Sequence, residues 1–200
     1  MANYNYEYEY DTRYCYPNSN TLKNKLNIMD AYQLEDAERK ITSLLSMEAL
    51  QKGIRGEFDF NHLKRIHKYL FNDIYDWAGK MRLVNISKGN QFCKVEFIEM
   101  QMNEVLDKLS NENYLRDIPT KKELASRLAY YFGEINAIHP FREGNGRCQR
   151  LLLQLLCDSL GYELDFTGIS QSEMLEASDK SFKLDYDLLE SLLERSLTQQ

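Results

Sequence analysis

Apolar residues recur at spacings of three and four positions through most of this chain, which is the period of a helix with one buried face. Residues 30–52 and 60–77 show the pattern most clearly. In the second segment, the positions that would share one face are Leu63, Ile66, Leu70, Ile74 and Trp77. Only three prolines and nine glycines interrupt the 200 residues. The sequence therefore predicts a largely helical protein.

Capping boxes mark the starts of two later helices. Thr120 can cap free backbone N–H groups while Glu123 reaches back, and Ser170 with Glu173 repeats the pattern. The helix that follows Thr120 would bury an apolar face and end near Pro140. Two further helices are expected over residues 99–109 and 184–197.

One segment departs from the helical period. Arg82–Ser87 and Gln91–Ile98 flank the turn sequence at residues 88–90, which predicts a short β-hairpin. The run Leu151–Leu156 is apolar nearly all round, which is typical of a helix at the centre of a bundle. That helix would begin at Gly146 or Arg147. The predicted fold class is all-α, with one small β-hairpin.

Composition and charge narrow the range of functions. A net charge of −6 argues against general nucleic-acid binding, which usually needs a basic face. No apolar run reaches the length of a membrane span, and the N-terminus lacks the charged and apolar regions of a secretory signal. The four cysteines form no CxxC pair, so reduced thiols in a cytoplasmic protein are the simplest interpretation.

The N-terminus differs from the rest of the chain. Tyrosines at positions 4, 6, 8, 10, 14 and 16 alternate with polar residues. A polar alternating segment has weak strand register, so residues 1–15 are expected to form a partly ordered tail. Its tyrosines are also candidates for self-modification. Residues 16–200 are expected to form a single domain.

The densest group of polar residues lies in a tight loop before the central helix. It contains a base, a carboxylate, a Gly-Asn-Gly turn and two arginines, in the order His139-Pro140-Phe141-Arg142-Glu143-Gly144-Asn145-Gly146-Arg147, then Arg150. At the N-terminus of a helix, unpaired N–H groups and the positive end of the helix dipole attract phosphate. Gly144 and Gly146 would let the backbone approach the anion. Arg147 and Arg150 would lie on one side of the first turn.

The other two polar groups complete a set suited to a nucleotide. Glu143 would be repelled by phosphate unless a cation such as Mg²⁺ lay between them. His139 is suited to act as the general base for an attacking hydroxyl. A lone histidine at a helix end is more often structural, but the neighbouring motif residues favour an active site. His62 and His67 have no such neighbours and are expected at the surface or in packing. Cys148 is expected to be a small packing residue.

This motif resembles the complete signature of the Fic (filamentation induced by cAMP) family, HxFx(D/E)GNGRxxR. Residues 16–28, 66–79 and 92–98 extend the likeness, which covers roughly residues 14–195. Fic proteins are all-α folds with one hairpin, and most with an intact motif transfer AMP from ATP to a protein hydroxyl. The resemblance therefore implies a Mg²⁺-dependent protein adenylyltransferase (AMPylator) that acts on Ser, Thr or Tyr of a target protein.

The resemblance also implies a role for each motif residue. His139 is the base, Glu143 carries Mg²⁺, and Pro140 and Phe141 hold the loop. The nucleotide phosphates would be bound by Gly144, Asn145, Gly146, Arg147 and Arg150. The hairpin resembles the family's target-docking flap, whose residues here are Lys88, Gly89, Phe92, Cys93 and Lys94. We expect the target to lie along this flap, with Phe92 or its neighbours pinning the modified side chain.

Two alternatives to AMP transfer remain open. The chain could be a silent module that binds nucleotide without turnover, although the intact His139 and Glu143 argue against it. It could also transfer another phosphate-containing group, as some related proteins with altered motifs do. The sequence does not identify the target or the oligomeric state.

The last expectation concerns how the activity is controlled. Fic proteins are commonly restrained by a helix with the motif [S/T]xxxE[G/N], whose glutamate pairs with the second motif arginine, here Arg150. Ser172–Ala177 has the spacing with Ala in the last position, and the segment ending at Glu194 is one residue short. We therefore expect a separate antitoxin-like partner, with self-inhibition through Glu194 as the competing hypothesis.

Overall fold

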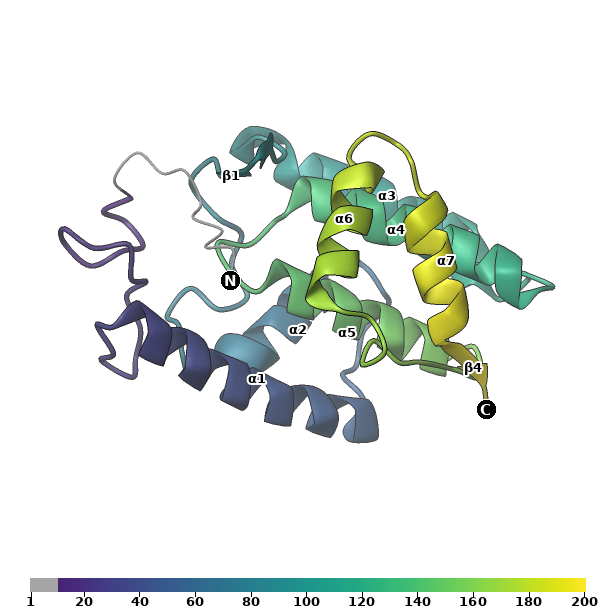
Figure 1. The fold of residues 1–200 in the computed structure, drawn as a ribbon, viewed down its shortest axis with the longest axis horizontal. Coiled ribbons are helices and arrows are strands. Elements are labelled where there is room, and N and C mark those ends of the chain that lie inside the picture. The colour runs from purple at the N-terminus through teal and green to yellow at the C-terminus, as the bar shows by residue number, and fades with distance from the viewer. Residues whose placement is uncertain (1–10) are drawn as a thin grey trace.

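Helix α5 (Asn145–Asp158) lies at the centre of the molecule in the computed structural model, which describes residues 11–200 (Figure 1). It packs against three other helices, α1, α2 and α4. Its leucines at positions 151, 152, 153 and 156 are all buried, which confirms the predicted central helix. The other helices are α1 (Ala31–Lys52), α2 (Phe60–Phe71), α3 (Ile98–Asn111), α4 (Lys121–Ile138), α6 (Gln171–Ser181) and α7 (Asp187–Ser196).

Side-chain caps fix several helix starts. Asp30 and Asp59 cap α1 and α2 by accepting hydrogen bonds from backbone N–H groups of the first turn. The capping box at Ser170 is complete in α6. Thr120 caps α4 as predicted. The Glu123 carboxylate, however, accepts from the Thr120 hydroxyl at 3.0 Å, whereas a capping box would have it accept from the Thr120 backbone N–H. The predicted starts of these helices are thus confirmed.

Helix α2 ends at Phe71, earlier than the predicted end at Trp77. The N–H of Ile74 bonds to the Phe71 carbonyl, and the Ile74 carbonyl accepts from the N–H of Lys25 at 2.8 Å. The chain therefore turns after Phe71 to meet the N-terminal segment. Ile74 is still fully buried, so the prediction of its burial was correct and the helix length was wrong.

The β-hairpin exists but is much shorter than predicted. Strand β1 (Ser87–Lys88) pairs with β2 (Asn90–Gln91), and Gly89 forms the turn with φ 74°. Beyond Phe92 the expected strand is replaced by the 3₁₀ helix η1 (Val95–Phe97). The reason is that the N–H of Cys93 bonds to the Ala137 carbonyl of α4, which pulls the chain away from its partner strand.

A second antiparallel pair was not predicted. Strand β3 (Tyr162–Leu164) pairs with β4 (Leu197–Gln199) and ties the C-terminus to the segment after α5 (Figure 1). Helix α7 begins at Asp187, later than the predicted Leu184, because Leu184 has a left-handed backbone with φ 63°. A further 3₁₀ turn, η2 (Asn113–Leu115), links α3 to α4.

Two sequence expectations concern the termini and the membrane. The tyrosines at positions 4 to 10 lie outside the described residues. Tyr14 and Cys15, placed in the expected tail, are buried in the core. None of the described helices is long and apolar enough to cross a membrane.

Candidate active site

The backbone at the end of α4 presents His139 to the motif loop. His139 is the C-cap of α4 and adopts a left-handed conformation with φ 52° and ψ 63°. Its N–H still bonds to the Ile135 carbonyl at 3.0 Å, so the helix ends and the chain turns at this residue. The imidazole Nδ1–H donates to the Asn136 carbonyl, with 3.2 Å between the heavy atoms. This contact leaves Nε2 as the nitrogen that can accept a proton.

Burial keeps the His139 imidazole neutral. Only 8% of the residue is exposed, and this desolvation lowers its pKa to about 3. The bond to Asn136 opposes that shift, whereas the positive charges of Arg82 and Lys88 reinforce it. A histidine with this pKa is unprotonated throughout the neutral range, so its base form is always present.

Phe92 of the flap covers one face of the catalytic candidate. Its ring lies parallel to the His139 imidazole, with centroids 3.8 Å apart and planes inclined by 16°. Phe92 also contacts Phe182 at the end of α6 and is itself only 6% exposed. The flap residue expected near the target is therefore a packing partner of His139.

Arg82 is a site residue that sequence reasoning missed. Its side chain is 1% exposed, and its Nε–H donates to the His139 carbonyl at 2.8 Å. Its other N–H groups donate to the carbonyls of Val84, Cys93 and Ile138. Burial lowers the pKa of Arg82 to about 10. Arg82 thus fastens the start of the flap to the backbone of His139.

Asn145 closes the motif loop on itself. Its side-chain oxygen accepts from the Phe141 N–H, and its side-chain NH₂ donates to the Phe141 carbonyl, each at 2.8 Å. Phe141 is fully buried, which fits the anchoring role expected for it. Pro140 is also held, because its carbonyl accepts from the Arg82 N–H at 2.9 Å. The Asn145 amide is therefore committed to the shape of the loop.

Gly144 is required for two separate reasons. It is the N-cap of α5 with φ 81°, a conformation that other residues adopt with strain. A Cβ atom at this position would lie 2.2 Å from the Phe71 ring. The helix bonds of α5 begin with the Cys148 N–H, and no acceptor within residues 11–200 satisfies the N–H groups of residues 145–147. Three such donors at the start of a helix are suited to bind an anion.

His67 supports the loop from α2. It is fully buried, and its ring stacks on Phe141 with centroids 4.0 Å apart. Nε2–H donates to the Glu143 carbonyl at 3.1 Å, while Nδ1 accepts from the Gly79 N–H at 2.8 Å. Desolvation lowers its pKa to about 3. The packing role expected for His67 is confirmed, and this packing touches the motif directly.

Glu143 and Arg147 lie together at the entrance to α5. The Glu143 carboxylate accepts from the Gly144 N–H at 2.8 Å and from Arg147 Nη2 at 3.3 Å. Arg147 also donates to Glu38 and, at 3.2 Å, to the Thr42 hydroxyl, both of which belong to α1. Glu38 is the second site residue that sequence reasoning missed. Its place in the helical pattern gave no sign of its partner.

Arg150 lies one turn further along α5. Within the described part of the chain, no hydrogen bond or ion pair engages its guanidinium, in contrast to Arg147. Burial lowers its pKa, and the nearby charge of Arg147 adds to the effect. An arginine that lacks a carboxylate partner among the described residues, one turn from the start of a helix, favours an anion at that end of the helix.

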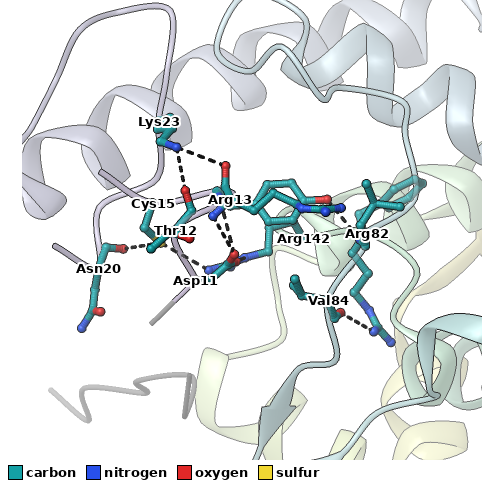
Figure 2. Close-up of polar contacts among 12 residues, drawn as sticks. Asp11, Thr12, Arg13, Cys15, Asn20, Lys23, Arg82, Val84 and Arg142 are labelled. Atoms are coloured by element: carbon teal, nitrogen blue, oxygen red, sulfur yellow. Dashed lines mark hydrogen bonds and ion pairs between the residues drawn. The ribbon is translucent and has the colours of Figure 1, made fainter. Parts of the chain in front are cut away.

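The first motif position without a predicted role, Arg142, holds the N-terminal segment. Figure 2 shows its guanidinium reaching Asp11, with Nε and Oδ2 3.1 Å apart, and the Cys15 thiol. Both charged side chains are at most 5% exposed. Tyr14 adds a hydrogen bond from the Leu83 N–H to its hydroxyl. The N-terminal segment therefore contacts both the motif loop and the start of the flap.

The remaining flap residues are partly or fully exposed. Gly89 and Lys94 are exposed, and Lys88 and Cys93 are half-buried. The tip is attached to α6, because the Asn90 side-chain amide donates to Asp179 at 2.9 Å. Cys148 is fully buried, as expected for a packing residue.

The chemistry of the site follows from these contacts. A neutral histidine whose Nε2 can accept a proton lies at one end of a loop. A helix terminus with N–H groups unpaired among the described residues and with two arginines, which is suited to an anion, lies at the other. No group of three or more His, Cys, Asp or Glu side chains suited to a metal occurs among the described residues. A cation at Glu143 would therefore need ligands from the bound molecule. The arrangement suits a polyphosphate and a nucleophile that must lose a proton.

Known proteins are similar to this chain in sequence and in fold. Residues 57–157 match the Fic/DOC family model. The chain is 40% identical to the protein adenylyltransferase VbhT of Bartonella schoenbuchensis over 93% of its own length, and it spans 39% of that relative. It is 36% identical to the probable protein adenylyltransferase y4lH of Sinorhizobium fredii, of which it covers 94%. The probable protein adenylyltransferase Fic of Escherichia coli is 33% identical, with 92% covered.

Solved structures of Fic proteins have the same fold as this chain. The N-terminal Fic domain of a putative cell filamentation protein from Bartonella quintana, with bound ADP, superposes with a TM-score of 0.89 at 28% identity, covering 94% of this chain and 96% of that one. The BepC protein of Bartonella tribocorum has the same fold, also with a TM-score of 0.89, at 24% identity, covering 96% of this chain and 100% of that one. The chain belongs to the Fic/DOC family.

Proposed function

We propose that this protein is a protein adenylyltransferase, which transfers AMP from ATP to the hydroxyl of a Ser, Thr or Tyr residue of a target protein. The observation that carries the proposal is the pairing of a neutral His139, with Nε2 free to accept a proton, and the anion-binding terminus of α5. The relatives named protein adenylyltransferase and the ADP-bound Fic domain support the choice of an adenine nucleotide.

The proposed reaction is a displacement at the α-phosphorus. The target hydroxyl oxygen forms a bond to phosphorus, its proton passes to His139 Nε2, and the bond to the pyrophosphate oxygen breaks with its electron pair leaving on pyrophosphate. The N–H groups of residues 145–147 stabilise negative charge on the α-phosphate. Arg147 and Arg150 hold the β- and γ-phosphates. The chain contributes mainly positioning and charge stabilisation.

Glu143 is the residue that would hold Mg²⁺. Its side chain is 28% exposed at the mouth of the helix terminus, so it can face the nucleotide. One carboxylate completed by phosphate oxygens and water is a ligand set that Mg²⁺ commonly takes. When bound, Mg²⁺ would offset part of the triphosphate charge. A Glu143→Ala variant should lose the Mg²⁺ dependence of activity.

We infer that the target lies along the flap. Among the described residues, strand β1 pairs with β2 alone, and an open strand edge recruits an extended segment. Because Phe92 is buried against His139, the contact with the modified residue falls to exposed neighbours such as Lys94.

We also propose that the enzyme is restrained in trans by an antitoxin-like partner that supplies a glutamate to Arg150. Two observations support it over self-inhibition. Helix α7, which carries Glu194, packs against α4 and α6. Glu176 pairs with Lys180 at 3.1 Å on its own helix. Removing α7 would expose the buried Leu189 and Leu193, so Glu194→Ala is the cleaner test. A rise in AMP transfer for that variant would favour self-inhibition.

Labelled ATP tests the central proposal. With a cell lysate as the source of targets, label on the α-phosphate should appear on protein, and label on the γ-phosphate should not. His139→Ala should lower the rate by roughly 10² to 10⁴ while ATP binding persists. Transfer of γ-label would identify a phosphotransferase instead. ATP binding without transfer of either label would identify a silent nucleotide-binding module.

A further inference from the structure

Glu38 is a buried carboxylate that the proposed reaction does not use. It lies midway along α1, its side chain is 8% exposed, and it accepts hydrogen bonds from Arg147 and from the Tyr75 hydroxyl. A buried charge is costly unless it is paired and hydrogen-bonded, and here both conditions are met. The nearest ordinary explanation is a structural ion pair between α1 and α5.

The contacts of Arg147 point to a more specific role. Nη2 donates to Glu38 and Nη1 donates to the Thr42 hydroxyl, which itself donates to the Glu38 backbone carbonyl at 2.8 Å. The guanidinium carbon lies 4.8 Å from the centroid of the Phe71 ring. Side chains from α1 and α2 thus fix the orientation of a motif arginine from two directions.

Among the described residues, these contacts leave some N–H groups of the Arg147 side chain without an acceptor. A guanidinium carries five N–H groups. Among the described residues, the acceptors of its side chain are Glu38, Thr42 and Glu143, and none of them engages Nε. The Glu143 contact is the longest of the three, at 3.3 Å. If Glu143 turns towards a cation, Glu38 and Thr42 still hold the arginine in place. Arg150, in contrast, has no carboxylate partner among the described residues.

We propose that Glu38 is a positioning residue, which holds Arg147 so that its remaining N–H groups meet the β- and γ-phosphates of the nucleotide. The inference rests on the proposed ATP site and deepens it. Glu38 does not touch the nucleotide. It acts through Arg147, and its contribution should therefore depend on how many phosphates the nucleotide carries.

A nucleotide series separates this role from a structural one. Affinities for AMP, ADP and ATP are measured by calorimetry without Mg²⁺, for the wild type and for Glu38→Ala and Glu38→Gln. Glu38→Ala should weaken ATP and ADP binding by roughly tenfold or more, the usual effect of losing a charge-assisted hydrogen bond, and leave AMP binding unchanged. Glu38→Gln keeps an acceptor for Arg147 and should recover part of the loss. Kinetically, the KM for ATP should rise more than kcat falls.

Two matched variants complete the experiment. Glu35→Ala removes an exposed glutamate of the same helix and should change nothing. Thr42→Val removes the other α1 acceptor of Arg147 and should reproduce a smaller form of the Glu38→Ala effect, which keeps the test informative if Glu38→Ala does not fold. Equal weakening of all three nucleotides would reduce Glu38 to a structural ion pair. Tighter ATP binding in Glu38→Gln would show that the Glu38 carboxylate competes with the phosphates for Arg147. Either result overturns the proposal, and neither depends on AMP transfer to a protein.

Discussion

The ring of Phe92 lies flat against the imidazole of His139, with centroids 3.8 Å apart. One residue belongs to the flap and the other ends α4, so the stack joins the proposed target-docking segment to the proposed base. It also removes water from one face of the imidazole. Burial of the ring, to which this stack contributes, is the largest cause of the low pKa of His139, about 3.

Phe92→Ala should therefore change the pH profile of the reaction. In the wild type, His139 is neutral at every pH above about 3, so kcat/KM should show no acid limb from it between pH 5 and 8. Exposing the ring should raise its pKa towards 6.5, and activity should then fall as the pH drops below neutrality. The control is Phe97→Ala, which removes an exposed phenylalanine of η1 and should leave the profile flat. A flat profile in both variants would show that Phe92 does not set the state of the base.

Gly144→Ala should destabilise the protein through strain and through contact with Phe71. The residue has φ 81°, and the new Cβ would lie 2.2 Å from the ring. The two effects together should lower the free energy of unfolding by about 2–5 kcal/mol. Gly53→Ala is the matched control, because Gly53 has φ 72° but open space around it. Denaturant titration of both variants measures the contribution of the Phe71 contact as their difference. Equal losses would mean that strain alone explains Gly144.

Much of this site could be predicted from local sequence, and some of it could not. The motif loop and the central helix follow from short-range signals, namely the Gly-Asn-Gly turn and the apolar run after Arg150. The partners of Arg147 do not, because Glu38 is distant in sequence and looks like any polar position of an amphipathic helix. The predicted length of the flap strands was wrong for a similar reason.

In the flap, tertiary hydrogen bonds prevailed over local pattern. Alternation at residues 91–98 predicts a strand, but the N–H of Cys93 bonds to the Ala137 carbonyl and the Cys93 carbonyl accepts from Arg82. The first bond goes to α4 and the second to a side chain, so neither pairs the backbone of one predicted strand with that of the other. A single arginine in an apolar segment gives no sequence signal that its side chain will bind the backbone at the end of α4.

Asp11→Asn should loosen the attachment of the N-terminal segment to the motif loop. The Asp11 carboxylate and the Arg142 guanidinium are 3.1 Å apart and almost completely buried. Replacing the charge with an amide should lower the free energy of unfolding by about 1.5–3 kcal/mol, the range for hydrogen bonds to charged groups. Asp76→Asn is the control, since Asp76 forms an exposed pair with Lys25 and should have almost no effect. An Asp11→Asn protein with wild-type stability would show that the charge of Asp11 does not help to hold the segment.

Buried histidines should make the fold sensitive to acid. Desolvation lowers the pKa of both His67 and His139 to about 3 in the folded protein, whereas an unfolded histidine titrates near 6.5. Between these values the unfolded state binds more protons, so the free energy of unfolding falls as the pH falls from 6.5 towards 3. The slope should approach about 1.4 kcal/mol per pH unit for each histidine. Denaturant titrations at pH 7.5, 6 and 5 measure it.

His67→Gln isolates one of the two contributions. Glutamine can still donate to the Glu143 carbonyl, which His67 Nε2–H reaches at 3.1 Å, but it cannot take up a proton. The variant should be less stable at pH 7.5, because the stack on Phe141 is lost, and its stability should decline less steeply with acid. The carboxyl of Glu38 has its pKa raised by burial and acts in the opposite direction in both proteins, so it cancels in the comparison. If stability falls equally steeply with pH in the wild type and in His67→Gln, His67 titrates normally in the folded state. That result would contradict the burial of His67 in its stack on Phe141.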